Sequence, residues 1–295
     1  MDILTKAVTK DGYMRIYAVT SKDTVETARK IHNTTPVVTA ALGRTLTAGI
    51  LMGSMIKEEN ADITLQLKGG GPAGLIIAVA KHDGFVKGYV ENPDADLPLN
   101  SIGKLDVGGV VGTAGYLSVV KDLKMKEPYI GKVPLQTGEV GDDIAFYYAQ
   151  SEQVPSVVAL GVLVDKDLSV KAAGGFIIQV MPDCDELSLA RLEKSIQGLK
   201  SVTALLEDGM GSEDIIKYIM EGFEVDILES KEVGYKCDCS RDRTYRAIKS
   251  LGKDEINAII EEDGRAEVNC HFCSKSYLFG EEDLKNMIEE IENKR

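Results

Sequence analysis

Alternating apolar and polar positions predict a series of short strands over the first 181 residues. A hairpin is expected at residues 3–20, around a Lys10-Asp11-Gly12 turn. Further strands are expected at 62–68, 75–80, 85–90, 115–122, 128–135, 157–164 and 172–181. Short turns, not helical crossovers, join most of them, so the pattern indicates an α+β domain built on antiparallel sheet and argues against a doubly wound fold.

Helical periodicity appears in three places within this part of the chain. A polar helix is expected from Ser21 to Asn33, and another from Glu139 to about Ser151. Thr35-Pro36 signals the start of a longer helix that reaches about Lys57. Apolar residues cover most of the circumference of this long helix, so it must be buried.

From Cys184 onward the pattern changes to amphipathic helices, expected at 185–207 and 212–221. A strand-like stretch at 222–236 follows. The remaining expected elements are helices from Ser240 to Leu251, Lys253 to Asp263 and Glu281 to Asn293, with a hairpin from Arg265 to Phe279. We therefore expect an N-terminal α+β domain at 1–181, a helical connector at 182–230 and a small C-terminal zinc-binding domain at 231–295.

Two glycine-rich runs resemble phosphate-binding loops only superficially. The run at 69–74 is not followed by Gly-Lys-Ser/Thr, and the element after it reads as a strand. The run at 108–112 lacks the G-x-G-x-x-G order of dinucleotide-binding folds. We interpret the first run as a turn and the second as a loop.

Four of the five cysteines form two close pairs, Cys237-Asp238-Cys239 and Cys270-His271-Phe272-Cys273. Two such pairs separated by thirty residues can bring four sulfurs to one tetrahedral ion, and Zn²⁺ favours thiolate ligands. Four thiolates leave no open coordination position, so we expect one structural zinc per chain and no catalytic zinc. His271 could replace a ligand, although the fourth cysteine makes that unnecessary.

The size of the module suggests that its fold depends on this metal. Structural zinc contributes about 10–16 kcal/mol of folding free energy, whereas so small a core rarely supplies more than about 3–5 kcal/mol. Disulfides within each cysteine pair would close very short loops and restrain little of the chain. Four cysteines allow three connectivities, however, and spacing does not choose among them.

Charge and composition narrow the possible partners and location. The formal net charge is −13, and residues 231–295 carry twelve basic and fifteen acidic side chains, which argues against a nucleic-acid-binding zinc module. No export signal or membrane span is expected, and cysteines arranged for metal are typical of a reducing cytosol. The histidines His32, His82 and His271 form no evident acid–base or nucleophile arrangement, so no enzyme activity is expected.

Ordered motifs outside the cysteines run over nearly the whole length of the chain. These are Leu42-Gly43-Arg44, Gly69-Gly70-Gly71-Pro72, Tyr129-Ile130-Gly131-Lys132-Val133, Gly138-Glu139, Tyr147-Tyr148, Ser151-Glu152-Gln153-Val154-Pro155-Ser156-Val157-Val158, Ala173-Gly174-Gly175-Phe176, Phe272-Cys273 and Tyr277. Together with the two cysteine pairs, they make the sequence resemble the heat-shock protein 33 family of cytosolic chaperones.

The resemblance implies an ATP-independent holdase that is inactive when reduced and zinc-bound, and that binds unfolding proteins after oxidation. In this family the four cysteines pair as neighbours, which here implies disulfides Cys237–Cys239 and Cys270–Cys273. Zinc then leaves, the linker loosens and the active form dimerises. Cys184 has no counterpart in the motif, and we expect it to act as a small buried hydrophobe.

Loss of the zinc domain should also loosen the connector that packs beside it, and expose its apolar faces to clients. The candidate client-binding residues are Leu187, Leu192, Ile196, Leu199, Ile215, Ile216, Ile219 and Met220.

Two other functions stay open. Cys270-His271-Phe272-Cys273 could serve a thiol–disulfide oxidoreductase, although that motif normally opens a helix after a strand, and here alternation continues to Phe279. A constitutive zinc-stabilised scaffold is the second alternative. Insulin-reduction turnover would identify the first, and a zinc content insensitive to oxidant would support the second.

Overall fold

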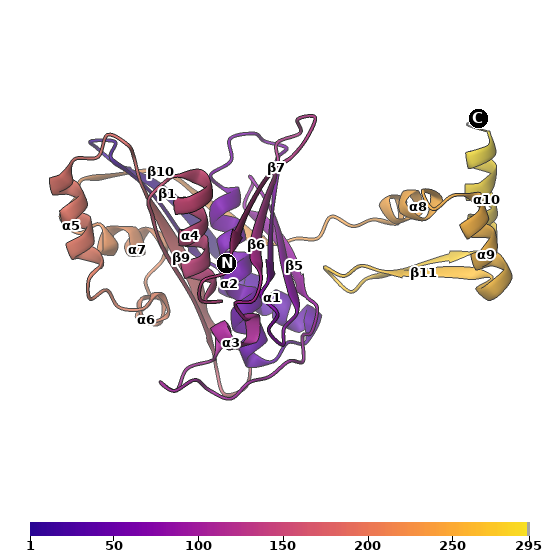
Figure 1. Cartoon of the computed structure of the whole chain (residues 1–295), viewed down its shortest axis with the longest axis horizontal. Coiled ribbons are helices and arrows are strands. Elements are labelled where there is room, and N and C mark those ends of the chain that lie inside the picture. The colour runs from indigo at the N-terminus through magenta and orange to yellow at the C-terminus, as the bar shows by residue number, and fades with distance from the viewer. Residues whose placement is uncertain (294–295) are drawn as a thin grey trace. The chain divides into compact units, whose positions relative to one another are not determined.

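The computed structural model describes residues 1–293. The chain forms two compact units, Met1–Lys236 and a second unit that begins at Cys237 (Figure 1). The segment 182–230 lies within the first unit.

The first unit is built on one ten-stranded sheet, in the order β7-β6-β3-β4-β5-β10-β1-β2-β9-β8. All neighbouring strands are antiparallel except β5 and β10, which are parallel. The strands are β1 (Asp2–Thr9), β2 (Met14–Thr20), β3 (Asp62–Lys68), β4 (Leu75–Lys81), β5 (Phe85–Val90), β6 (Tyr116–Asp122), β7 (Tyr129–Pro134), β8 (Ser156–Val164), β9 (Val170–Val180) and β10 (Val225–Tyr235). The α+β class and its antiparallel sheet are thus confirmed.

The long helix α2 (Pro36–Gly53) is the centre of the main core. Sixteen of its eighteen residues are buried, against β3, β4, β5, β8 and β9. Among the described residues it alone is long and apolar enough to pass a test for membrane spans, but 89% of that window is buried inside the protein. Helix α1 (Lys22–His32) packs against it, as does α4 (Val140–Tyr147), which continues into a π-helical turn η1 (Tyr148–Glu152).

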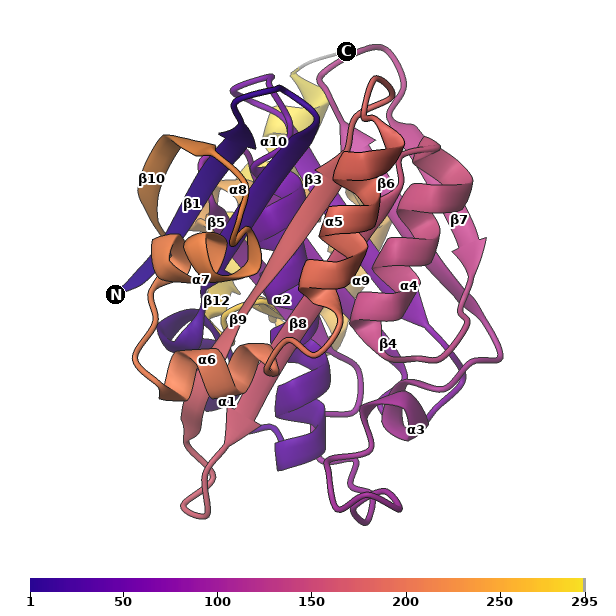
Figure 2. The same cartoon turned by 90° about the vertical axis from the view of Figure 1, so that its left-hand side faces the viewer.

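Three short helices form a second core on the strands β1, β2, β8 and β9. They are α5 (Glu186–Ile196), α6 (Val202–Glu207) and α7 (Ser212–Ile219), and Figure 2 shows them in front of these strands. The single helix expected over 185–207 is wrong, because the chain breaks between α5 and α6. Gly198 takes φ +84°, and the side chain of Ser201 begins the new helix by accepting from the N–H of Ala204 at 3.3 Å.

The two glycine runs pack directly against each other. The N–H of Gly71 donates to Val111 O at 2.9 Å, and that of Ala73 donates to Val110 O at 3.0 Å. The first run is a turn, as expected. The loop expected at 108–112 is wrong, because the five-residue helix α3 (Val107–Val111) forms there, with the side chain of Asp106 as its N-cap.

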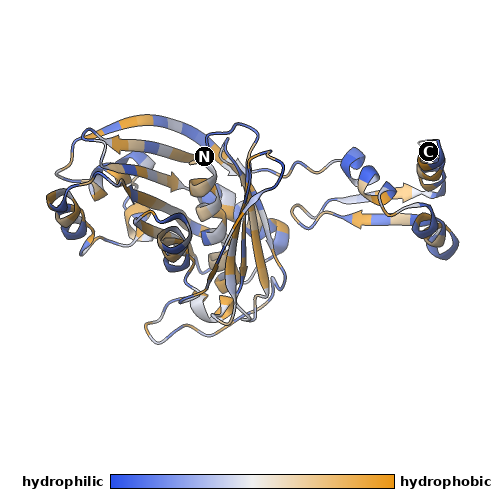
Figure 3. Cartoon of the chain, turned by 45° about the horizontal axis from the view of Figure 1, so that its top comes forward, coloured by the Kyte–Doolittle hydropathy of each residue, from blue (hydrophilic) through white to orange (hydrophobic). Residues whose placement is uncertain are grey.

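The second unit surrounds a small core of its own. It consists of α8 (Arg241–Lys249), α9 (Lys253–Asp263), the hairpin β11 (Arg265–Asn269) and β12 (Ser276–Gly280), and α10 (Glu281–Glu292). Figure 3 shows how hydrophobic residues alternate with hydrophilic ones along the strands. The buried core residues are Ile248, Ile256, Phe279, Leu284 and Met287. So few buried side chains supply limited stability, which leaves room for a metal to contribute.

Candidate metal centre

The four paired cysteines converge on one point in the second unit. Their Sγ atoms all lie within 4.8 Å of one another. Cys237 and Cys239 come from the segment after β10, and Cys270 and Cys273 come from the turn between β11 and β12. The Sγ atoms of Cys237 and Cys270 are 3.7 Å apart, and those of Cys239 and Cys273 are 3.3 Å apart.

Local hydrogen bonds explain how the C-x-x-C turn places two sulfurs on one side. The N–H groups of Cys273 and Ser274 both donate to Cys270 O, at 3.3 and 2.8 Å. Ser274 takes φ +56°, and the N–H of Cys270 donates to Lys275 O at 2.9 Å, which closes the turn onto the hairpin. The turn therefore faces both thiols toward the C-x-C segment.

The donor set fits a zinc ion. With Zn–S bonds of about 2.3 Å, tetrahedral geometry requires sulfurs about 3.8 Å apart, close to the spacings found here. All four donors are soft sulfurs, and each is half-buried, so the group can enclose a metal ion without an open position. His271 is not part of this group.

Tyr277 contacts one of the four cysteines, a role that the sequence did not predict. Its hydroxyl donates to Cys239 Sγ at 3.1 Å. Burial opposes ionisation of Cys239, but the hydrogen bonds from Tyr277 and the neighbouring thiols lower its pKa to about 7. Burial raises the pKa of Cys237 to about 12 and also raises that of Cys273. Tyr277 is the second residue of β12. Strand periodicity alone does not predict that a residue at this position contacts a thiol.

Three of the four basic residues of α8, namely Arg241, Arg243 and Lys249, pair with acidic groups of the same unit. Arg241 pairs with Asp283 at 2.7 Å, and its guanidinium lies 4.3 Å from the ring centroid of Phe279. Arg243 lies 3.3 Å from Asp238, between the first two cysteines. These pairs neutralise much of the local positive charge.

The candidate client-binding residues lie mainly together, in the second core of the first unit. Leu192, Ile215, Ile216, Ile219 and Met220 are buried there, and Ile196 and Leu199 pack against them. Leu187 is the exception, since it is 80% exposed.

Cys184 lies apart from the other four cysteines. It is half-buried against the second core, and it is not part of the four-sulfur group.

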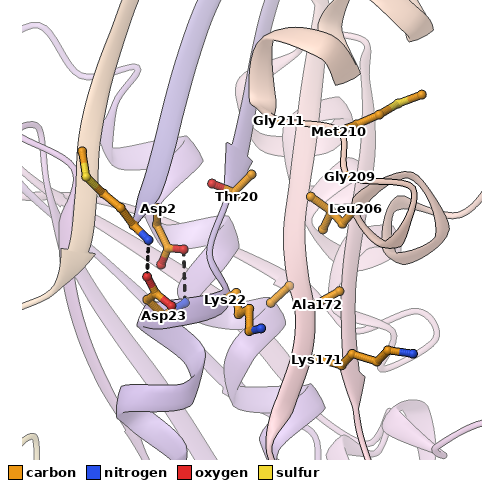
Figure 4. Close-up of a pocket in the computed structure, with 12 residues that line it drawn as sticks. Asp2, Thr20, Lys22, Asp23, Lys171, Ala172, Leu206, Gly209, Met210 and Gly211 are labelled. Atoms are coloured by element: carbon orange, nitrogen blue, oxygen red, sulfur yellow. Dashed lines mark hydrogen bonds and ion pairs between the residues drawn. The ribbon is translucent and has the colours of Figure 1, made fainter.

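A surface pocket beside the N-terminus offers charged groups that are already engaged (Figure 4). The carboxylate of Asp2 accepts from the N–H groups of Asp23 and Thr24, at 3.1 and 2.7 Å. Lys171 pairs with Glu207 at 2.6 Å. These bonds hold the start of α1 against β1 and engage most of the pocket's charged groups.

Comparison with known proteins gives consistent matches over almost the entire chain. The family described as Hsp33 protein matches residues 2–280. The 33 kDa chaperonin of Clostridium acetobutylicum is 48% identical over 295 residues, covering 100% of this chain and 99% of that protein. That of Caldanaerobacter subterraneus is 50% identical over 292 residues, covering 99% of each. The crystal structure of the 33 kDa chaperonin (heat shock protein 33 homolog) from Thermotoga maritima superposes with a TM-score of 0.90 at 36% identity, covering 99% of both chains.

Proposed function

Because this chain belongs to the Hsp33 family of chaperones, we propose that it is a redox-regulated, ATP-independent holdase. In this proposal the reduced, zinc-bound protein is inactive. Oxidation of the four cysteines converts it into a form that binds unfolding proteins and prevents their aggregation. The observation that carries the proposal is the convergence of four thiols from two separate segments on one point.

One zinc ion per chain would be held by Cys237, Cys239, Cys270 and Cys273. Bound there, it would supply cross-links between the segment after β10 and the β11–β12 turn. The core of five buried residues in this unit is small, so the fold of the unit that begins at Cys237 would depend on that link. Removal of the metal should therefore unfold the domain.

Oxidation would consume the thiols as metal ligands. Each pair of thiolates would lose two electrons to hydrogen peroxide and form one S–S bond, while the O–O bond breaks and its oxygens take up two protons from solvent to leave as two water molecules. We propose the neighbour pairs Cys237–Cys239 and Cys270–Cys273, which leave the two halves of the site unconnected. The cross pairs Cys237–Cys270 and Cys239–Cys273 would keep the halves tied, so peptide mapping of the oxidised protein distinguishes the two outcomes.

The client surface would come from the connector 182–230. Its apolar side chains are now held against the sheet of 1–181, so they would become available only after the helices α5–α7 detach. Strand β10 joins α7 to Cys237, and loss of structure in 231–295 would remove the restraint at the far end of that strand. Exposed apolar surface of this kind is what unfolding proteins bind.

The remaining parts of the proposal concern partners and location. We propose a cytoplasmic protein that forms a homodimer when active, and that neither binds nucleic acid nor enters a membrane. The net charge of −13 and the ion pairs of Arg241 and Arg243 argue against nucleic-acid binding. The burial of α2 argues against membrane insertion. Submicromolar, salt-dependent RNA binding by the reduced protein would contradict this reading.

The decisive experiment follows zinc release and suppression of client aggregation in the same samples, before and after peroxide. We expect no suppression before oxidation, and suppression that rises together with zinc release afterwards. Zinc retained through peroxide treatment would favour the constitutive scaffold. Catalytic turnover of insulin disulfides would favour the oxidoreductase.

A further inference from the structure

Strand β8 forms one edge of the ten-stranded sheet, and its outward backbone groups can be identified from the register. The N–H of Val180 donates to Pro155 O at 3.0 Å, so the pair 155 and 180 is hydrogen-bonded. In an antiparallel pair such positions recur every two residues, so the odd-numbered residues of β8 bond to β9. The even-numbered residues therefore turn their N–H and C=O groups away from the sheet.

Only half of this edge is covered. A Cβ built on Gly141 of α4 would lie 3.7 Å from Val158 O and 3.9 Å from Leu160 N, so α4 lies against the first half of the strand. Beyond the part covered by α4, four main-chain groups have no recorded hydrogen bond within the part of the chain that the structure describes. They are the C=O of Leu160, the N–H and C=O of Val162, and the N–H of Val164. These four groups are two donors and two acceptors, spaced as an added strand requires.

A cavity of about 480 Å³ adjoins this uncovered half. Its walls come from β8, from α2 and the loop that precedes α3, and from the start of α6; none of them belongs to the cysteine-containing unit. Its apolar lining includes Leu99, Leu105, Leu160, Val162 and Val202. Most of this lining is apolar, so the cavity favours an apolar occupant.

The charged side chains in the lining favour an occupant that carries a carboxylate. Arg44 pairs with Glu139, but its Nε is buried without a hydrogen-bond partner among the described residues. Lys104 is exposed and has no recorded ion pair in residues 1–293. Asp165 is the single acidic residue of the lining. Beyond the Arg44–Glu139 pair, Lys104 and the buried Nε of Arg44 remain as donors against this one carboxylate.

Other occupants fit less well. Full pairing of β8 with β8 of a second copy is blocked because α4 covers the first half of the edge, and two chains of charge −13 repel each other. A small apolar molecule would leave the four main-chain groups without partners. The opposite edge strand, β7, carries Lys132 and Pro134, which discourage strand addition, whereas β8 contains neither charge nor proline.

We propose that the edge of β8 from Leu160 to Val164 binds a short, extended, apolar peptide segment bearing a carboxylate, by addition of one strand to the sheet. The segment pairs with the four free main-chain groups and places its acid beside Arg44 and Lys104. This polypeptide-binding site goes beyond the proposed switch, because it is present in the reduced protein and does not require oxidation.

The test measures binding of a fluorescent six-residue peptide to the reduced, zinc-loaded, full-length protein. The peptide alternates valine with threonine and ends in glutamate. A copy methylated on its alternate backbone nitrogens should bind at least about tenfold more weakly, because it cannot donate to Leu160 O and Val162 O. Equal affinity of the two peptides, or no binding up to about 1 mM peptide, overturns the proposal.

Two further measurements locate the site. Lys104→Glu should weaken the glutamate peptide roughly three- to tenfold, while Lys57→Glu, an exposed lysine outside the lining, should leave it unchanged. Residue-resolved amide exchange should slow at Val162 and Val164, and stay the same at Leu163, whose N–H already faces β9. Protection elsewhere without protection at Val162 contradicts the assignment, whether or not peroxide activates the chaperone.

Discussion

The hydroxyl of Tyr235 donates a hydrogen bond to the carbonyl oxygen of Gly88 at 2.8 Å. Nε2 of His32 lies 2.9 Å from the same oxygen, so α1, β5 and the end of β10 meet at one acceptor. Tyr235 is two residues before Cys237, and the next N–H, that of Lys236, donates to Val86 O at 2.9 Å. These contacts fasten the last residues of the sheet unit immediately before the cysteines begin.

Replacing Tyr235 with Phe should therefore loosen the end of β10. The hydroxyl also accepts from the N–H of Gly88 at 3.3 Å, and loss of its bonds to Gly88 predicts about 1 kcal/mol of local destabilisation, seen as about fivefold faster amide exchange at Lys236. Tyr13→Phe is the control, because no hydrogen bond of the Tyr13 hydroxyl is recorded among residues 1–293. Unchanged exchange at Lys236 would show that the strand end is held by main-chain pairing alone.

Cys239→Ser should reduce zinc affinity severely, because three thiolates leave an incomplete shell. The variant should also lose the cooperative unfolding of 231–295. Metal content by elemental analysis and melting of the reduced protein provide the measurements. Cys184→Ser should keep both zinc and switching, since Cys184 is outside the four-sulfur group. Full zinc content in Cys239→Ser would refute the four-thiolate site.

Peroxide should remove amide protection from 182–295 while most of 1–180 stays protected. Helices α5–α7 pack on β1, β2 and β9, so their detachment should also expose the sheet face beneath them. Ala7, Ile16 and Phe176 should then gain solvent access, detectable as binding of a hydrophobic dye with the same time course as chaperone activity. Activity that appears while α5–α7 remain protected would place the client site elsewhere.

Glu26 should contribute stability that depends on pH. Its carboxylate accepts from the Arg29 guanidinium at 2.8 Å and from the N–H of Val170 at 2.9 Å. The bonds from Arg29 are the largest cause of a fall in the pKa of Glu26 from 4.5 to about 2, and those from Val170 and Lys30 add to it. Since the folded-state pKa is below the unfolded value, this stability is present above pH 4.5 and is lost as pH falls toward 2.

Glu26→Gln should accordingly lower Tm by about 2–4 °C at pH 7. The difference from the parent protein should shrink progressively below pH 4.5. Thermal melts of the reduced protein at pH 7 and pH 3 measure both effects. Glu59→Gln, an exposed carboxylate with no recorded ion pair in the described chain, serves as the matched control. A Tm difference independent of pH would assign the effect to packing.

Gly71→Ala should destabilise the first unit by about 1–3 kcal/mol. A Cβ at Gly71 would lie 2.5 Å from both Val110 O and the carbonyl carbon of Val111, so the α3 backbone would have to move. Gly103→Ala is the comparison, since Gly103 has φ +74° but open space around it and so measures backbone strain without a clash. Urea denaturation should show the larger loss for Gly71→Ala, and no loss for Gly71→Ala would mean that the α3 backbone moves without cost.

Local patterns predicted most elements and the whole cysteine site. Period-2 alternation marked every strand of the first unit to within a few residues, and cysteine spacing alone identified the four sulfurs that meet. The break before Ser201 was missed although Gly198 and Ser201 are both ordinary end signals, because the apolar spacing runs through it. The short helix at 107–111 was missed because it is only five residues long and its contacts with Gly71 and α2 are distant in sequence.

The order of the strands could not be read from local pattern. Only two residue pairs join β10 to β5, and nothing in the 225–235 sequence indicates a position between β1 and β5. The exposed half of the β8 edge likewise depends on where α4 lies. Tyr277 reaches Cys239 only because the hairpin register places it there. Long-range placement, not local preference, was the missing information in each case.

The central place of β10 has a consequence for synthesis of the protein. This strand joins β1 on one side to β5 on the other, so the sheet consists of two blocks until residues 225–235 arrive. Both blocks are complete once β9 ends at Val180, so at about 5–20 residues per second a growing chain spends roughly 3–11 s with their facing edges unpaired before β10 is finished. Unpaired strand edges promote aggregation. The nascent protein therefore needs protection until β10 has been translated.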